Sequence, residues 1–202
     1  MARPAPVRLT CFGAAPDKRY SLGPTNMQNL LTAVRTSCSE KNWYAALYMA
    51  LTLPDICANL QEPGAKESGK RYRAWFDRYL KPVYKSEFHG PDFHFLRSGD
   101  CWALRCSLLH EGSDEISGQR SREVLSQFKF TTQGVHLGMM EDVLVLNVSM
   151  FCNEVCAAVE GWLQDVAADY GVQERIGGMA RVEVGGFSPI PGVWLGERGG
   201  GA

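Results

Sequence analysis

Long apolar runs and an excess of charge of either sign are both missing from this chain of 202 residues. No stretch approaches the roughly 20 apolar residues that a membrane-spanning helix needs, and residues 1–20 lack the apolar segment of a secretory signal. The 21 Lys and Arg residues are balanced by 22 Asp and Glu, so the formal net charge is −1. This balance excludes a general attraction to nucleic acid, and any site for a polyanion must be local. We therefore expect a soluble, cytoplasmic protein that does not bind membranes.

The seven cysteines form neither a disulfide framework nor a zinc-binding pattern. They are scattered along the chain as Cys11, Cys38, Cys57, Cys101, Cys106, Cys152 and Cys156. No Cys-x-x-Cys pair occurs, and Cys152 and Cys156 have no matching second pair that would complete a zinc site. Most of the cysteines lie in apolar segments, where a free thiol packs as a small hydrophobic side chain. The pattern predicts a reducing compartment and no metal or cofactor, with zinc as the alternative.

The length favours one domain with its own buried core. Residues 1–24 contain four of the ten prolines and no sustained periodicity, which predicts a flexible N-terminal arm. Residues 172–202 predict a glycine-rich C-terminal tail that contains one short strand at residues 182–184. We expect the folded domain to occupy residues 25–171.

Hydrophobic side chains at helical spacing predict two helices near the start of this domain. Thr25 or Asn26 can cap the first helix, which is expected within residues 25–42. The second, within residues 42–60, is either one long helix kinked at Pro54 or two pieces that meet there. Its aromatic and methionine side chains are expected in the core.

Two further helices are predicted after a polar loop. Ser68 can begin one of them, and this helix must end before Pro82. Ser98 or Asp100 can cap the other, which stops at Gly112.

The pattern then changes to that of β-structure. Residues 124–132 and 143–149 are rich in β-branched and aromatic side chains, and turn signals in residues 133–142 separate them, so we expect a two-stranded hairpin. A last long helix is expected over residues 150–171, with Gly171 as its stop. Its core-facing side chains are predicted to be Phe151, Val155, Ala158, Val159, Trp162 and Val166. The fold class is therefore mainly α, with a small β-hairpin before the last long helix.

Only one of the four histidines lies in a setting that suggests chemistry. His89, His94 and His136 lie in predicted loops or turns without a ligand pattern, and we expect them at the surface. His110, in contrast, follows Arg105 by five positions at the end of a predicted helix.

The spacing of Arg105 and His110 predicts a covered helix face. At about 100° per residue the two side chains lie about 140° apart, with Cys106 and Leu109 in the arc between them. The core-facing stripe of the same helix is expected to comprise Cys101, Leu104 and Leu108. Apolar residues in the intervening arc suggest that another helix, or the same face of a second subunit, covers it. Across a two-fold axis, two copies of Arg105 and His110 would meet in one cleft.

An Arg–His pair is sufficient for RNA cleavage without metal. Histidine, with an ordinary pKa of about 6.5, can take a proton from a ribose 2′-hydroxyl or give one to the leaving oxygen. The arginine can hold the scissile phosphate and its developing charge. Internal attack leaves a 2′,3′-cyclic phosphate. Alternatively, Arg105 and His110 only cap the helix or pair with acidic neighbours such as Glu111.

The Arg-x-x-x-x-His motif from Arg105 to His110 resembles the signature of the HEPN superfamily. Four longer strings resemble a bacterial and phage HEPN-like group, and they occupy residues 53–60, 69–80, 99–112 and 143–152. The similarity spans roughly residues 27–170. It implies an HEPN-like helical bundle that dimerises through the motif helix. Many members are metal-independent endoribonucleases of toxin–antitoxin, phage-defence or RNA-processing systems, whereas others have lost catalysis and serve as binding modules.

The resemblance also implies roles for single residues. Arg105 would stabilise the phosphate, and His110 would act as acid or base. Many active members have Asn or Asp after the motif arginine, where this chain has Cys106, which cannot supply the same hydrogen bonds. Ser107 and Glu111 remain as polar partners.

Asp55 is a further candidate, because a carboxylate on the second helix could orient the motif arginine or histidine. The alternative is that Asp55 follows Pro54 merely as a helix-start carboxylate.

A basic segment provides candidate RNA contacts, namely Lys70, Arg71, Arg73 and Arg78. The aromatic residues between these cations could stack on bases. The spacing equally fits an amphipathic helix that buries Tyr72, Trp75, Phe76 and Tyr79 and turns its cations to solvent.

Three functions are consistent with these features. The first is a dimeric, metal-independent endoribonuclease, with RNA as substrate and an antitoxin protein as a partner. The second is a catalytically inactive HEPN-like module that binds RNA, a nucleotide or a protein. The third is a structural or host-interaction protein that retains the motif only at a dimer interface.

Overall fold

The structure is a computed structural model that describes residues 25–64, 66–183 and 185–196. Within these ranges the chain forms six α-helices: α1 (Asn26–Ser39), α2 (Trp43–Gln61), α3 (Ser68–Tyr79), α4 (Ser98–Glu111), α5 (Val148–Asp165) and α6 (Tyr170–Gly177). Two short 3-10 helices, η1 (Lys81–Tyr84) and η2 (Glu87–His89), lie between α3 and α4. The strands are β1 (Gln127–Thr131), β2 (Gly138–Met140) and β3 (Val143–Asn147). The mainly α fold class is therefore confirmed. The arm expected at residues 1–24 lies outside the described residues.

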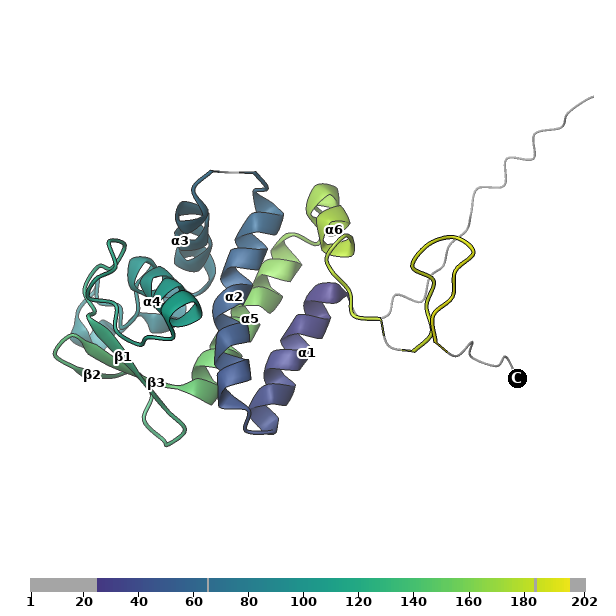
Figure 1. The fold of residues 1–202 in the computed structure, drawn as a ribbon. Coiled ribbons are helices and arrows are strands. Elements are labelled where there is room, and N and C mark those ends of the chain that lie inside the picture. The colour runs from purple at the N-terminus through teal and green to yellow at the C-terminus, as the bar shows by residue number, and fades with distance from the viewer. Residues whose placement is uncertain (1–24, 65, 184, 197–202) are drawn as a thin grey trace, which may run out of the picture.

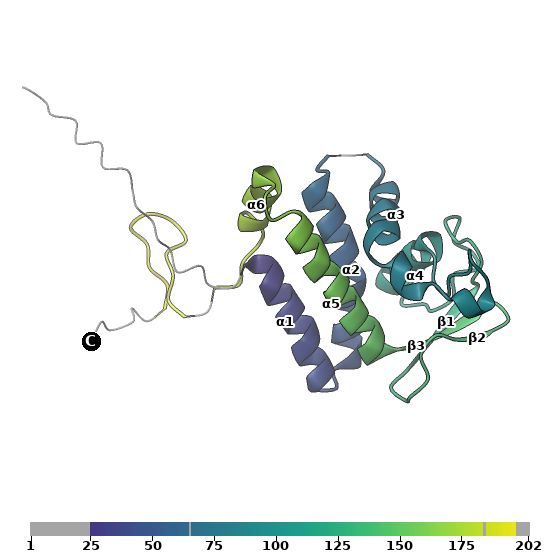
Figure 2. The ribbon, with the colours of Figure 1, turned by 180° about the vertical axis from the view of Figure 1, so that it is seen from behind.

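The helices pack around α2. The long helices α1, α2 and α5 run side by side, and α3 and α4 cover the side of α2 that faces away from α1 (Figures 1 and 2). The small sheet lies beyond α4, and α6 packs at the far end of the three long helices (Figure 1). This arrangement brings α2 and α4, which carry the candidate site, into direct contact.

The first two helices begin where the sequence predicted. Thr25 and Gln28 form a reciprocal capping box at the start of α1. The side chain of Asn42 accepts a hydrogen bond from the Ala45 N–H at the start of α2. This second helix continues through Pro54, so the alternative of two separate pieces is wrong.

The start of α4 differs from the prediction, whereas its end is confirmed. Arg97 occupies the cap position, and Ser98 is already the first helical residue. The buried Asp100 carboxylate accepts hydrogen bonds from the backbone N–H groups of residues 123–125, so it fixes the following connection rather than its own helix. The helix ends at Gly112, whose φ of 67° lies in the left-handed region that glycine adopts without strain.

The β-structure is not the predicted hairpin. The strand order is β1-β3-β2, with β1 parallel and β2 antiparallel to β3. The third strand, β2, comes from the segment predicted to be only a turn. The nearly continuous apolar run of β3 is typical of a central strand, which needs a neighbour on both edges. Local patterning identified the strands that now form β1 and β3 but not their pairing.

The last predicted helix is in fact two helices. Its core-facing side chains are buried as expected: Phe151, Val155, Ala158, Val159, Trp162 and Val166. However, α5 ends at Asp165, and Asp169 caps α6, so the stop predicted at Gly171 is wrong. Val172 and Ile176 of α6 are buried, and the packed part of the chain therefore extends beyond residue 171. Residues 182 and 183 are not in a strand.

Most described cysteines are buried. Cys57, Cys101, Cys152 and Cys156 are in the core, and all described cysteines are free thiols. Burial raises the pKa of Cys101 to about 12, so this thiol stays protonated. These residues therefore serve as small core side chains, as the sequence predicted.

Candidate functional site

Arg105 joins two other predicted residues in one cluster. Its Nη2 lies 2.8 Å from Asp55 Oδ2 of α2, and its Nη1 lies 3.3 Å from His110 Nε2 of α4. We call Asp55, Arg105 and His110 the motif cluster. The arginine and aspartate side chains are 18% and 22% exposed, whereas His110 is exposed. The ion pair is thus largely removed from solvent, while the imidazole remains accessible.

The contact between Arg105 and His110 orients the imidazole. Arginine has only donors, so Nε2 of His110 is the acceptor in this contact. An exposed imidazole is a group that can act as a general base.

Asp55 lies inside α2 and pairs across to α4, so the interpretation of this residue as a helix-start carboxylate is wrong. The same contact answers the question of what Arg105 pairs with, since its carboxylate partner is Asp55. Glu111 is exposed and instead accepts a hydrogen bond from Gln119 Nε2 at 3.2 Å.

Trp102 belongs to this site, although the sequence reasoning missed it. The guanidinium carbon of Arg105 lies 5.2 Å from the centre of the Trp102 ring, at a distance suited to a cation–π contact. The ring in turn packs on Tyr72 of α3, with centroids 5.1 Å apart, and on Gly69. The sequence did contain a signal for this contact, because Trp102 precedes Arg105 by three residues, and residues at that spacing are neighbours on a helix surface.

One donor of the motif cluster is unused. Arg105 Nε is buried and has no hydrogen-bond partner among the residues that the structure describes. Buried polar groups are usually satisfied, so this unpaired N–H is an exception within the motif cluster.

The helix face between Arg105 and His110 is only partly covered. Cys106 and Leu109 are half-buried, and neither belongs to the hydrophobic core formed by the described residues. Burial raises the pKa of the Cys106 thiol above its ordinary value, against the opposing effect of the Arg105 charge. The predicted core stripe of Cys101, Leu104 and Leu108 is buried as expected.

Ser107 lies apart from the motif cluster. Its side chain is buried, and the hydroxyl donates to the backbone oxygen of Glu115 at 2.7 Å. This contact holds the connection after α4 in place. Of the supporting residues predicted from the sequence, the structure brings Asp55 and Cys106 to Arg105, but neither Ser107 nor Glu111.

The four cations of α3 do not share one face. Arg71 and Arg73 lie about 200° apart around the helix. Lys70 pairs with Glu67 at 3.6 Å, and Arg78 pairs with Asp165 at 2.8 Å. Arg73 Nε donates to the backbone oxygen of Gly69. Lys70, Arg71 and Arg78 lie within about 100° of one another and share one side of α3, whereas Arg73 lies away from Arg71 and Arg78.

The aromatic residues of α3 follow the amphipathic alternative. Tyr72, Trp75 and Phe76 are buried, and Tyr79 is half-buried. The ring faces of Tyr72 and Phe76, which are fully buried, are consequently not available for stacking on bases.

The prediction that His136 lies at the surface is wrong. Its side chain is only 6% exposed, its Nε2 lies 2.9 Å from Glu154 Oε1, and its Nδ1 accepts from the Asn147 N–H. Tyr84 donates to the other oxygen of Glu154 at 3.0 Å. These contacts join the start of α5 to the loop before β2, so we assign this network to the fold. His89 is exposed, as expected.

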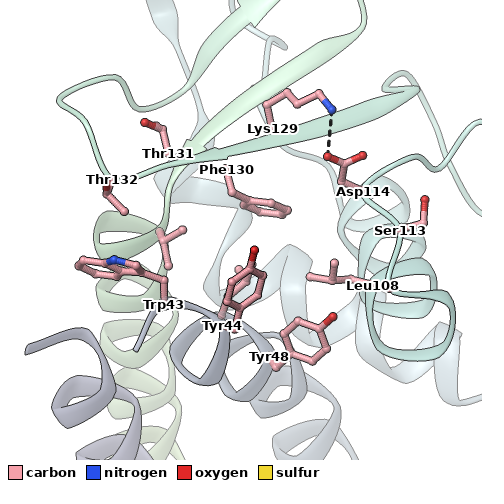
Figure 3. Close-up of a pocket in the computed structure, with 13 residues that line it drawn as sticks. Trp43, Tyr44, Tyr48, Leu108, Ser113, Asp114, Lys129, Phe130, Thr131 and Thr132 are labelled. Carbon is pink, nitrogen blue, oxygen red and sulfur yellow. Dashed lines mark hydrogen bonds and ion pairs between the residues drawn. The ribbon is translucent and has the colours of Figure 1, made fainter. Parts of the chain in front are cut away.

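A second candidate site lies where the first turns of α2 approach the C-terminal end of α4. It is a cavity of about 870 Å³, and its aromatic lining comprises Trp43, Tyr44, Tyr48 and Phe130 (Figure 3). Tyr44 is 80% exposed, so the prediction that the aromatic side chains of this segment all lie in the core is wrong. The cavity combines α2, α4 and β1, and sequence patterns do not reveal such a combination.

Two negative findings concern metals and membranes. Across the described ranges, no group of three or more His, Cys, Asp or Glu side chains is arranged to hold a metal ion. No helix in this part of the chain has the length and apolar character to span a bilayer.

Comparison of the chain with family models, curated proteins and solved structures gave no match. Function must therefore be inferred from the side chains themselves.

Proposed function

We propose that the protein is a metal-independent endoribonuclease of the HEPN type, acting in the cytoplasm, with Arg105 and His110 as its reactive pair. One observation carries the proposal: Arg105 contacts the Asp55 carboxylate at 2.8 Å and the accessible His110 imidazole at 3.3 Å. The helical fold and the Arg-x-x-x-x-His spacing are consistent with it.

The chemistry follows from the groups present. His110 takes the proton of a ribose 2′-hydroxyl, and the 2′-oxygen attacks the adjacent phosphorus. The P–O5′ bond breaks, and the 5′-oxygen accepts a proton from a second, protonated His110. Arg105 stabilises the extra negative charge on the phosphoryl oxygens. The products are a 2′,3′-cyclic phosphate and a 5′-hydroxyl.

The second His110 would come from another copy of the chain. Cys106 and Leu109 lie on the half-covered face of α4 and do not join the core of the described residues. Packing of this face against its own copy across a two-fold axis would bury them and bring two motif clusters together. We therefore include dimerisation through α4 in the proposal.

Asp55 and Trp102 would act as positioning residues. The carboxylate and the indole ring hold the guanidinium from two sides. A guanidinium fixed in this way loses little freedom when it binds the phosphate.

A second candidate function is a catalytically inactive module that binds RNA, a nucleotide or a protein in a toxin–antitoxin or phage-defence system. The observation that favours it is the pairing of Arg105 with Asp55, which already neutralises the charge that a phosphate would need. Cys106, in place of Asn or Asp, adds to this argument because a thiol is a weak hydrogen-bonding group.

The test is RNA cleavage in the presence of EDTA. Purified protein incubated with mixed cellular RNA should give fragments that end in 2′,3′-cyclic phosphate. Arg105→Ala and His110→Ala should each abolish cleavage. The matched controls are Arg35→Ala, which removes an arginine paired with Glu160 at 2.7 Å, and His89→Ala, which removes an exposed histidine. Both controls should retain activity.

Two outcomes separate the candidates. Unchanged cleavage by the Arg105→Ala, His110→Ala double variant would refute the assignment of the reactive pair. Retention of RNA without cleavage, weakened by Arg105→Ala, would instead support the binding module.

A further inference from the structure

Strand β1 has an edge that is only half paired. One edge of β1 pairs with β3. On the outer edge, the Phe128 N–H donates to Asp114 O at 2.9 Å, and the Ile116 N–H donates to Ser126 O at 2.8 Å. The connection after α4 therefore runs antiparallel to the first part of β1 only.

The antiparallel pairing stops before β1 ends. Residues of a strand direct their peptide groups to alternate edges, so Phe130, like Phe128, presents its N–H and C=O to the outer edge. The next bonds of this ladder would run from the Asp114 N–H to Phe128 O and between Phe130 and Gly112, and none of them is formed. Within the described ranges, the Phe130 N–H and C=O have no backbone partner on that edge.

This open edge borders the aromatic cavity. The lining of the cavity includes Phe130 of β1 and Gly112, where the chain departs from β1. The Phe130 ring points toward Tyr44, which is 80% exposed, and Tyr48 lies beside Tyr44 on α2 (Figure 3). Unpaired backbone groups and exposed aromatic side chains thus adjoin in one groove.

We infer that this groove binds an extended peptide segment of a partner protein. The segment adds to the outer edge of β1 beside Phe130, antiparallel to β1 and in line with residues 114–116. Its backbone pairs with the Phe130 N–H and C=O, as in other cases of strand addition. Every second side chain enters the cavity, where apolar and aromatic residues pack on Tyr44 and Tyr48. The cavity of about 870 Å³ is large enough for more than one such side chain.

Charge favours a peptide over RNA at this site. The charged residues of the lining are Lys129 and Asp114, which pair with each other at 3.0 Å. The groove therefore offers no unpaired cation to a phosphate. A lysine on an edge strand often prevents the addition of another strand. Here the ion pair with Asp114 holds the Lys129 side chain beside the part of β1 that is already paired, and so away from the open edge at Phe130.

The experiment uses the full chain and a displayed library of random short peptides. Peptides enriched on the wild-type protein are synthesised, and their affinities are measured by titration. We expect apolar residues at alternate positions of the enriched peptides. Tyr44→Ala should weaken binding about tenfold or more, because exposed aromatic anchors dominate such interfaces. The matched control is Tyr170→Ala on α6, where the tyrosine is 81% exposed, and it should bind as the wild type does.

Two readouts test strand addition itself without altering the protein. Bound peptide should slow hydrogen exchange of the Phe130 amide. Methylation of the one peptide nitrogen that donates to the Phe130 C=O should abolish binding, whereas methylation of the two neighbouring nitrogens should leave it nearly unchanged. Arg105→Ala should bind the peptides normally, so this inference stands or falls independently of ribonuclease activity.

Several results would overturn the inference. One is the enrichment of the same peptides on Tyr44→Ala protein, and another is an N-methyl scan in which no single position abolishes binding. Protection of the Phe130 amide by an oligouridylate but by no peptide would assign the groove to RNA. Self-association that Tyr44→Ala abolishes would assign it to a second copy of the chain.

Discussion

Asp55 and Arg105 are fifty positions apart in the sequence, yet their side chains form an ion pair of 2.8 Å between α2 and α4. The pair fixes the guanidinium next to His110 and on the face of Trp102. Its low exposure separates it from the other arginine–carboxylate pairs of the described chain, such as Arg35–Glu160, whose side chains are 45% and 44% exposed. A positioned arginine with an accessible histidine is the feature on which the proposed chemistry depends.

Replacement of Asp55 by Asn should release Arg105 and lower kcat about tenfold to a hundredfold with little change in KM, because the substitution removes orientation rather than a reacting group. The variant should also lose about 1–3 kcal/mol in the free energy of unfolding, since Arg105 remains partly buried without its anion. Steady-state cleavage and urea titration measure the two effects. Asp55→Glu should restore part of kcat. The control Glu160→Gln breaks an exposed pair and should change stability by less than about 1 kcal/mol. A role for Asp55 in stability alone would leave kcat unchanged.

Leu109→Asp should convert the proposed dimer into a monomer, because the charge would be placed at the centre of the half-covered face of α4. Sedimentation equilibrium measures the mass, and the cleavage assay should show a parallel loss of activity. Met150→Asp places the same charge at a site on α5 that is 47% exposed and should leave the dimer intact. A wild-type protein that is monomeric at all concentrations would contradict this prediction.

His136→Ala should destabilise the fold without changing cleavage. The substitution leaves the Asn147 N–H and one Glu154 oxygen without their partner in a mostly buried network, at a cost of about 1–3 kcal/mol in the free energy of unfolding. Thermal and urea denaturation measure the loss. His89→Ala, at an exposed position, should be nearly neutral. Equal effects of the two substitutions would show that the network contributes nothing to stability.

Asp114 should make the stability of the protein sensitive to acid. Partial burial alone would raise the pKa of this carboxyl, but hydrogen bonds from Gln127 and Lys129 outweigh it, and the pKa is lowered. A lowered pKa in the folded state means that the contribution to stability is present above the unfolded pKa of about 4 and is lost as the pH falls through the folded pKa. Asp114→Asn should therefore be less stable than the wild type at neutral pH. The difference in the free energy of unfolding should shrink as the pH falls below the unfolded pKa of about 4. Urea titrations of both proteins between neutral pH and the folded pKa measure this difference. A difference that grew on acidification would contradict the prediction.

Part of the site could be predicted from the sequence. Arg105 and His110 lie on one helix, so their angular separation follows from helical geometry alone. The same geometry placed Cys106 and Leu109 between them and Leu104 in the core, as the structure confirms. The sequence offered Asp55 as only one of several possible partners of Arg105. A contact between two helices depends on how they pack, and a sequence pattern does not show this.

The sequence by itself determined the local features of this protein. The capping box at Thr25, the stop at Gly112 and the buried stripe of α5 all depend on residues within a few positions of one another. Such signals are complete in a short stretch of chain, so a helical period reveals them.

Only the tertiary structure decided the rest. The parallel pairing of β1 with β3, the ion pair between Asp55 and Arg105, the burial of His136 and the open edge beside Phe130 each join segments that are distant in sequence. Strand order, in particular, depends on which edges of β3 are covered, and the alternation of side chains along a strand carries no information about its neighbours. The Arg-x-x-x-x-His motif lies within one helix, whereas the contacts of Arg105 with Asp55 arise from the packing of two helices.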